Sequence, residues 1–296
     1  MKRSAKLIRL LLFSGAAIRL ATPVVAGTAD DIIAKARAYL GGDAALSAVH
    51  SVHFSGVIET QKATPTGPVT QKASVEIFYQ KPHQQRSVVT GPETVETTGL
   101  DEYIAWRRVQ NVADSTRWQQ SVLDPDMIRW LRAMAWENLN FFKGIEQEGG
   151  TAEVVGDATI DGRAAVKVAI AHDAKIVFYH YFDSATGKLL TTEARNQTTK
   201  EEGEILVNGL RFPQKEIEVI KSLDAKGQPV ERTLVITFDK ITVNETFPES
   251  YFEVPSLPAA GRSSGEKSAA RQSTVAPAAG STGAKQAESA ATKGGG

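Results

Sequence analysis

One segment in the middle of the chain, DPDMIRWLRAMAWENLNFF from Asp124 to Phe142, most constrains the fold, because it has helical periodicity between strand-like neighbours. Asp124 can cap the helix, and Pro125 suits its first turn. Apolar residues recur at spacings of three and four, and Trp130 and Trp136 widen this stripe, so the helix needs cover on most sides. The sequence therefore predicts a mainly β (α+β) fold: a curved antiparallel sheet forming an incomplete barrel, with helices covering or filling its concave face.

Strand signals surround this segment on both sides. Alternation of apolar and polar residues begins near Ser51, and Asp161-Gly162, Thr186-Gly187 and Asn208-Gly209 each separate two alternating runs, which is typical of hairpins. Short connections favour antiparallel neighbours. We expect a loop at 62–69, strands at 203–207 and 210–223, and an N-terminal helix over 29–40 followed by a further turn at 43–49.

The two ends of the chain differ in composition from the body. Residues 1–26 begin with MKRSAKLIR, continue through an apolar run and end in VVA, which predicts a cleaved signal peptide and a periplasmic protein. Residues 258–296 are rich in Ala, Gly, Ser and Lys and lack aromatic residues, so we expect a disordered tail. Residues 27–257 then form one domain, without cysteine and hence without disulfides.

Charge is distributed unevenly along the chain. Of 34 basic and 34 acidic residues, the first 26 positions hold five bases and no acid, and the tail holds five bases and two acids. The body is left with 24 bases and 32 acids, an acidic balance that argues against nucleic acid as a partner.

Motifs for catalysis and for metal or cofactor binding are not found in the sequence. The nucleophile-elbow pattern at 261–265 falls in the tail, away from any strand and helix that could hold it. His50 and His53 straddle a helix-to-strand change, so we predict no metal site there. We expect His180 to be a hydrogen-bonded interior residue, and the adjacent Glu201 and Glu202 to form a solvated turn. No enzyme activity, catalytic residue or cofactor is predicted.

The apolar side chains of the central helix allow two interpretations. They fill the core, or the curved sheet leaves a groove beneath the helix, in which Met127, Trp130, Leu131 and Met134 line a lipid-sized cavity. The sequence leaves both possibilities open.

Several short motifs resemble the LolA/LolB-type lipoprotein carrier superfamily: VEIFYQKP, TGLDEYIAW, EILVNGLRFPQKEIEVIK, TFDKITVN and PESYFEVP. The resemblance covers about Ser51 to Pro255 and implies an incomplete barrel with helices as a lid over an apolar cavity for acyl chains. Lys81, before Pro82, matches a basic position linked to lipoprotein handling, although lysine lacks the planar fork of arginine. The candidate lipid-binding residues are Phe78, Trp106, Met127, Trp130, Leu131, Met134 and Phe178.

The function that follows is a periplasmic carrier or chaperone that shields the acyl chains of lipoproteins or another lipid. Envelope membrane proteins are further candidate partners, and no membrane span is expected after signal cleavage. The alternative is a non-transporting interaction or sensor module of the cell envelope, with the same fold filled by its own side chains.

Overall fold

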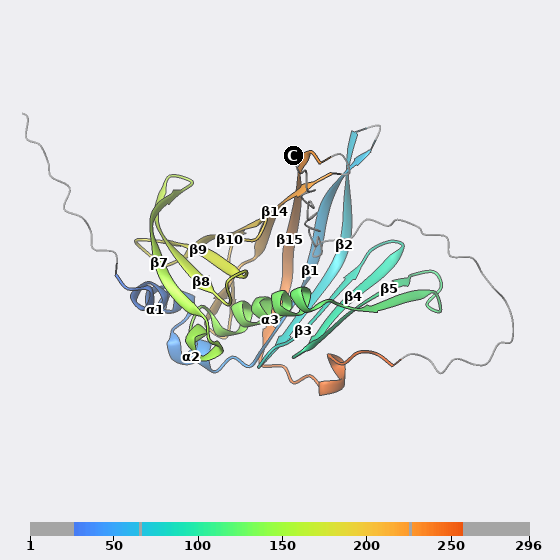
Figure 1. Cartoon of the computed structure of the whole chain (residues 1–296), viewed down its shortest axis with the longest axis horizontal. Coiled ribbons are helices and arrows are strands. Elements are labelled where there is room, and N and C mark those ends of the chain that lie inside the picture. The colour runs from blue at the N-terminus through green and yellow to red at the C-terminus, as the bar shows by residue number, and fades with distance from the viewer. Residues whose placement is uncertain (1–26, 65–66, 225–226, 257–296) are drawn as a thin grey trace, which may run out of the picture.

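A computed structural model describes residues 27–64, 67–224 and 227–256 (Figure 1). The predicted signal peptide and the predicted tail, including the nucleophile-elbow pattern, lie outside these residues.

A large antiparallel sheet dominates the described chain. It has thirteen strands in the order β6-β5-β4-β3-β2-β1-β15-β14-β11-β10-β9-β8-β7, and its two edges do not pair with each other. Most neighbours in the sheet are also neighbours in sequence, and the β1–β15 pair joins the two ends of the domain. The strands are β1 (Ser51–Thr64), β2 (Gly67–Gln80), β3 (Gln84–Thr90), β4 (Thr94–Asp101), β5 (Ile104–Asn111), β6 (Trp118–Val122), β7 (Thr151–Ile160), β8 (Arg163–Ala171), β9 (Val177–Asp183), β10 (Leu189–Ala194), β11 (Gln197–Glu202), β14 (Lys215–Leu223) and β15 (Pro229–Val243). The predicted incomplete barrel is therefore confirmed.

The central helix α3 (Pro125–Asn140) crosses the concave side of this sheet, between the arm that carries β7 to β10 and the arm that carries β1 to β5 (Figure 1). As predicted, Asp124 caps it, and the side chain accepts a hydrogen bond from the Met127 amide at 2.8 Å. The helix ends before the predicted Phe142, because Phe141 and Phe142 both adopt left-handed backbone conformations, with φ of 48° and 71°. Their rings consequently enter two different apolar clusters.

Two short helices at the N-terminus, α1 (Ala29–Leu40) and α2 (Asp43–Ser47), close one end of the domain. Arg37 of α1 is buried there, and its guanidinium contacts Asp43 at 2.6 Å and donates to the Phe141 carbonyl oxygen at 3.0 Å. The end of α3 is thus fixed to the N-terminal helices by a charged hydrogen-bond donor.

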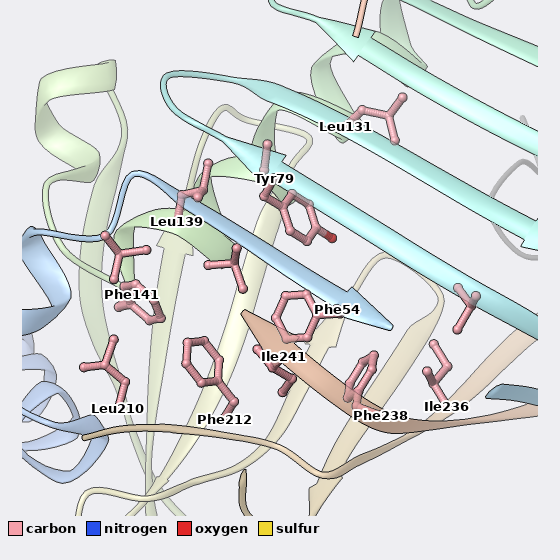
Figure 2. Packing of buried hydrophobic residues seen from close by; sticks show 14 of the residues in the cluster. Phe54, Tyr79, Leu131, Leu139, Phe141, Leu210, Phe212, Ile236, Phe238 and Ile241 are labelled. Carbon is pink, nitrogen blue, oxygen red and sulfur yellow. The ribbon is translucent and has the colours of Figure 1, made fainter. Parts of the chain in front are cut away.

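The main apolar cluster lies between α3 and the middle of the sheet (Figure 2). Phe54 of β1 is its centre, with Tyr79 and Phe212 edge-on to its ring at 6.2 Å and 5.9 Å and Phe238 at 5.0 Å. Leu139 of α3 is fully buried in the same cluster. The helix is therefore held by side chains rather than by backbone pairing.

Several strand limits differ from the predicted ones. The expected loop at 62–69 is instead the paired end of a long hairpin, with Lys62 opposite Val69. The strand expected at 210–223 is interrupted at Pro213, which has no amide hydrogen to donate, and is divided into β13 (Leu210–Phe212) and β14. The short β12 (Ile205–Val207) pairs with β13 in a separate hairpin, and β6 and β11 were not predicted.

The C-terminal part of the described chain packs on the convex face. The short 3-10 helix η2 (Glu249–Tyr251) places Phe252, which is fully buried, against Trp106 of β5, and the Trp106 indole donates to the Phe252 carbonyl oxygen at 2.9 Å. Arg86 lies 4.4 Å from the centre of the Tyr251 ring. Residues 247–252 thus cover one patch of this face, below the strands in Figure 1.

Candidate functional site

A cavity of about 360 Å³ lies between α3 and the concave face of the sheet. Its volume falls within the range of roughly 300–1,000 Å³ that is typical of small-molecule sites. Apolar side chains from both sides form much of its wall; they are Phe54, Ile58, Val75, Ile77, Val89, Met127, Trp130, Leu131, Met134, Phe178, Ala194, Phe212, Ile220, Leu234, Ile236 and Phe238. The domain therefore contains both a packed core and a cavity.

On the α3 side, the apolar part of the cavity wall is formed by Met127, Trp130, Leu131 and Met134, which lie on one face of the helix at spacings of three and four residues. The Trp130 ring stacks on Phe178 of β9 at 5.2 Å, nearly parallel, and the Arg195 guanidinium lies over the Trp130 ring at 4.2 Å. These contacts hold the indole in one orientation. The two methionines have flexible chains that can adjust to a bound molecule.

The structure brings five of the seven candidate lipid-binding residues to the cavity: Met127, Trp130, Leu131, Met134 and Phe178. It places Phe78 and Trp106 on the opposite face of the sheet, so their predicted position was wrong. Phe78 packs against Tyr251 and Phe247 at 5.1 Å and 5.3 Å.

Strand alternation explains both misplaced residues. On β2, Ile77 and Tyr79 line the cavity, so the intervening Phe78 points away from it. On β5, Arg107 lines the cavity, and Trp106 lies over Gly99 of β4 on the other face, where an added Cβ would come within 2.3 Å of the indole.

Lys81 lies at the turn between β2 and β3, outside the cavity wall. Its amide donates to the His50 carbonyl oxygen at 2.9 Å. Partial burial, with the nearby Arg37 as a smaller cause, lowers the pKa of Lys81. A role of Lys81 in lipoprotein handling stays a prediction.

Five carboxylates form part of the cavity wall, and the sequence predicted none of them there: Glu96, Glu137, Glu201, Glu216 and Glu218. Glu96 pairs with Arg107, which also lines the cavity, at 2.7 Å. Three of the five, Glu201 of β11 and Glu216 and Glu218 of β14, lie on neighbouring strands. The prediction that Glu201 belongs to a solvated turn was wrong, because β11 pairs with β14 along its length and turns this side chain inward. Glu202, the next residue, does reach a basic partner, Lys215, at 2.8 Å.

Burial changes the acidity of this cluster. It raises the pKa of Glu201 to about 7, an effect that the charge of Lys188 partly offsets, and it raises the pKa of Glu218 to about 7. The pKa of Glu216 is raised well above its usual value by burial and by the charges of Glu218 and Glu201. The wall is therefore mainly apolar, with an acidic region on β11 and β14 and other polar groups that include Arg107 and Arg211.

A second polar group, Glu137 of α3, is buried against the sheet at the cavity edge. Its two oxygens lie 2.8 Å from His172 Nε2 and 3.1 Å from His180 Nε2, and His180 Nδ1 lies 3.0 Å from the Thr192 hydroxyl. Burial acts to raise the pKa of Glu137, but the two histidines outweigh it and hold the pKa below its usual value. His180 is thus the hydrogen-bonded interior residue that was predicted.

Metal-binding geometry is not found in the described residues, where no group of three His, Asp or Glu side chains is placed to hold an ion. His53, considered above, instead stacks on Phe78 at 4.0 Å. In the same described ranges, no helix is long and apolar enough to cross a membrane.

Comparison with known proteins identifies similar structures but no matching sequence family. No protein-family model and no curated protein matches the chain. A LolA superfamily protein from Nitrosomonas europaea is similar, with 13% identity over 77% of this chain and 99% of that chain and a TM-score of 0.48. A DUF1329 family protein from Desulfovibrio piger has 10% identity over 76% and 97% of the two chains, with a TM-score of 0.47.

A protein described as an outer membrane lipoprotein-sorting domain, from Vibrio parahaemolyticus, has 9% identity over 76% of this chain and 97% of that chain, with a TM-score of 0.47. The superfamily that the sequence motifs resemble therefore also occurs among similar solved structures.

Proposed function

We propose that this protein is an exported carrier or chaperone that binds an apolar chain of a lipid or of an acylated protein and shields it from water. The observation that carries the proposal is the cavity of about 360 Å³ under α3, with Met127, Trp130, Leu131 and Met134 on one side and apolar strand residues on the other. Apolar area that a bound chain removes from water stabilises a complex by about 25 cal/mol per Å². The apolar leader at 1–26 supports export to the periplasm.

Access to the cavity depends on α3, because this helix covers the concave face and is attached through side chains. Arg37 holds the chain at the C-terminal end of α3 by donating to the Phe141 carbonyl oxygen, and Met127 and Met134 of the helix line the cavity. A chain that enters beneath the helix contacts adaptable side chains without breaking a backbone hydrogen bond of the sheet.

The test fills the cavity without adding charge. Val89 of β3 lines the cavity, and its sequence neighbour Val88 does not line it. Adjacent strand residues point to opposite faces, so Val89→Trp places an indole in the cavity and Val88→Trp places one on the convex face. Binding of a neutral fluorescent alkyl chain, such as a pyrene-labelled monoacylglycerol, is then titrated for the wild type and both variants.

The proposal predicts binding to the wild type and to Val88→Trp, with at least about tenfold weaker binding to Val89→Trp. Equal binding to all three proteins would place the probe elsewhere and contradict the proposal. Absence of binding to the wild type would also contradict it and would favour the non-transporting interaction module. Circular dichroism of both variants confirms that each is folded.

A further inference from the structure

A cavity that only shields an apolar ligand chain from water does not need the acidic region of this wall. Glu201 and Glu216 are direct partners across the β11–β14 pair, and Glu218 follows Glu216 on the same face. Directly opposed residues in such a pair have Cβ atoms about 5 Å apart, and like charges there destabilise the sheet. Three carboxylates thus lie together on one part of a mainly apolar wall.

No base forms an ion pair with these groups within the described part of the chain. There, Glu201, Glu216 and Glu218 take part in no ion pair or side-chain hydrogen bond, although many other acidic residues do. The two arginines of the cavity wall, Arg107 and Arg211, pair instead with Glu96 at 2.7 Å and Glu204 at 3.5 Å. Lys188, the base whose charge acts on Glu201, forms its ion pair with Glu204 at 2.8 Å. The carboxylates therefore keep their hydrogen-bond acceptor capacity toward the cavity.

Two further polar groups of the wall point to a ligand independently of the acids. Gln85 of β3 is 8% exposed and lines the cavity, and its amide oxygen has no hydrogen-bond partner. Tyr79, its direct partner on β2, is 4% exposed, and its hydroxyl forms no hydrogen bond with the described residues. Buried polar groups ordinarily have partners, so both groups are free to receive one from a bound molecule.

Tyr79 lies between the two kinds of polar group, because it pairs with Gln85 and is also near the carboxylates of β14. Tyr79 lines the same cavity as Glu216 and Glu218 and lies within electrostatic range of both. Figure 2 shows its ring beside Phe54, in the apolar cluster that α3 covers. The carboxylates and the Gln85 oxygen are acceptors, so the group that suits this region has several hydrogen-bond donors.

We propose that the cavity takes an amphiphile whose polar end is an ammonium group, which Glu201, Glu216 and Glu218 bind while its alkyl chain lies along the apolar wall under α3. This inference rests on the proposed function and specifies its ligand class. An ammonium offers donors and a positive charge to acceptors that otherwise repel one another. An anionic end, as in a free fatty acid, meets the same carboxylates and is disfavoured.

The experiment compares three probes of equal chain length: dodecylamine, dodecanol and dodecanoate. Each is titrated against the full-length protein at pH 8, below its micelle concentration, by displacement of the neutral pyrene probe. At this pH the amine is cationic and the acid is anionic. We expect dodecylamine to bind at least about tenfold more tightly than dodecanoate, with dodecanol between them.

Two variants assign the preference to the acidic region. In Glu216→Gln/Glu218→Gln the ratio of amine to carboxylate affinity should fall about tenfold. Glu202→Gln is the matched control, because Glu202 lies on the same strand as Glu201 but pairs with Lys215, and it should keep the wild-type ratio. Val89→Trp should weaken the binding of all three probes. This result would exclude a general electrostatic attraction of the acidic protein for amines.

The outcomes separate the two proposals. Binding of dodecanol together with equal affinities for amine and carboxylate would overturn the ammonium inference and leave the carrier function standing. A preference for the amine that persists in Glu216→Gln/Glu218→Gln or in Val89→Trp would also overturn the inference. Failure of all three probes to bind the wild type would contradict both proposals.

Discussion

His180 Nε2 of β9 lies 3.1 Å from a carboxylate oxygen of Glu137 of α3, and both side chains are almost completely buried. Glu137 holds His172 at 2.8 Å with its other oxygen, so one residue of the helix joins two segments of the sheet arm that carries β7 to β10. This contact fixes the height of α3 above the concave face, and with it the shape of the cavity.

Replacing Glu137 by alanine should destabilise the fold by about 3 kcal/mol, because two buried imidazoles lose their acceptor. Urea unfolding of the wild type and the variant measures the difference. Glu146→Ala, at an exposed position just beyond the helix, is the control and should change the free energy of unfolding by less than about 0.5 kcal/mol. Equal stabilities of Glu137→Ala and the wild type would show that the helix is held without this contact.

The acidic region predicts a pH dependence of stability. The pKa values of Glu201 and Glu218 rise from about 4.5 unfolded to about 7 folded, so the folded state binds more protons between these values. The contribution of these two carboxyls to the free energy of unfolding is fully present below about pH 4.5 and is lost as the pH rises through 7. The charge of Lys188 acts to lower the pKa of Glu201, and Tyr79 lies within electrostatic range of Glu216 and Glu218.

Changing all three glutamates to glutamine should therefore raise the free energy of unfolding at pH 8 by about 2 kcal/mol or more relative to the wild type, and the gain should shrink at pH 5. Unfolding curves at both pH values measure it. Glu202→Gln should give no such gain, because Lys215 lowers the pKa of Glu202. A gain that does not change with pH would refute ionisation as the cause.

Gly99 and Trp106 predict a steric effect on the convex face. A Cβ at Gly99 would lie 2.3 Å from the Trp106 indole. Gly99→Ala should therefore displace Trp106 and lower the free energy of unfolding by about 1–3 kcal/mol. Loss of the bond to the Phe252 carbonyl oxygen should also expose residues 247–252 to proteolysis. Gly91→Ala is the control, since its Cβ would lie 3.6 Å from the nearest atom and should be tolerated. Unchanged stability and protease resistance of Gly99→Ala would contradict the packing.

The cap of α3 predicts a smaller effect. Asp124→Ala removes the acceptor of the Met127 amide and should cost about 1 kcal/mol, whereas Asp124→Asn, which also caps, should cost less. Thermal unfolding distinguishes the two variants. Equal losses for both would mean that charge, rather than capping, determines the contribution of Asp124.

The sequence was sufficient to predict the fold class and the side chains of α3 that face the sheet, but it left open whether these side chains fill the core or line a cavity. Asp124, Pro125 and the repeat of apolar residues placed α3 correctly, since cap and periodicity are local properties of the chain. The hairpin signals gave the antiparallel order. The end of the helix was predicted less well, because the left-handed conformations of Phe141 and Phe142 are set by the two clusters that receive their rings.

The strand side of the cavity could not be predicted from alternation alone. In the segment KEIEVIK both sets of alternate residues contain large apolar side chains, and ordinary hydrophobicity would turn Ile217 and Val219 inward. The structure instead turns Glu216, Glu218 and Ile220 toward the cavity. Phe78 and Trp106, named as candidates together with the family resemblance, lie on the other face, where the segment at 247–252 contacts them.

Native mass spectrometry of the protein purified from the periplasm of its own cells, with extraction and identification of anything bound, tests the central claim most directly. Wild type and Val88→Trp should carry a stoichiometric molecule with an apolar chain, and Val89→Trp should carry none. A wild-type protein that is empty and also fails to take up the neutral alkyl probe, or a molecule retained equally by Val89→Trp, would contradict a carrier function of the cavity.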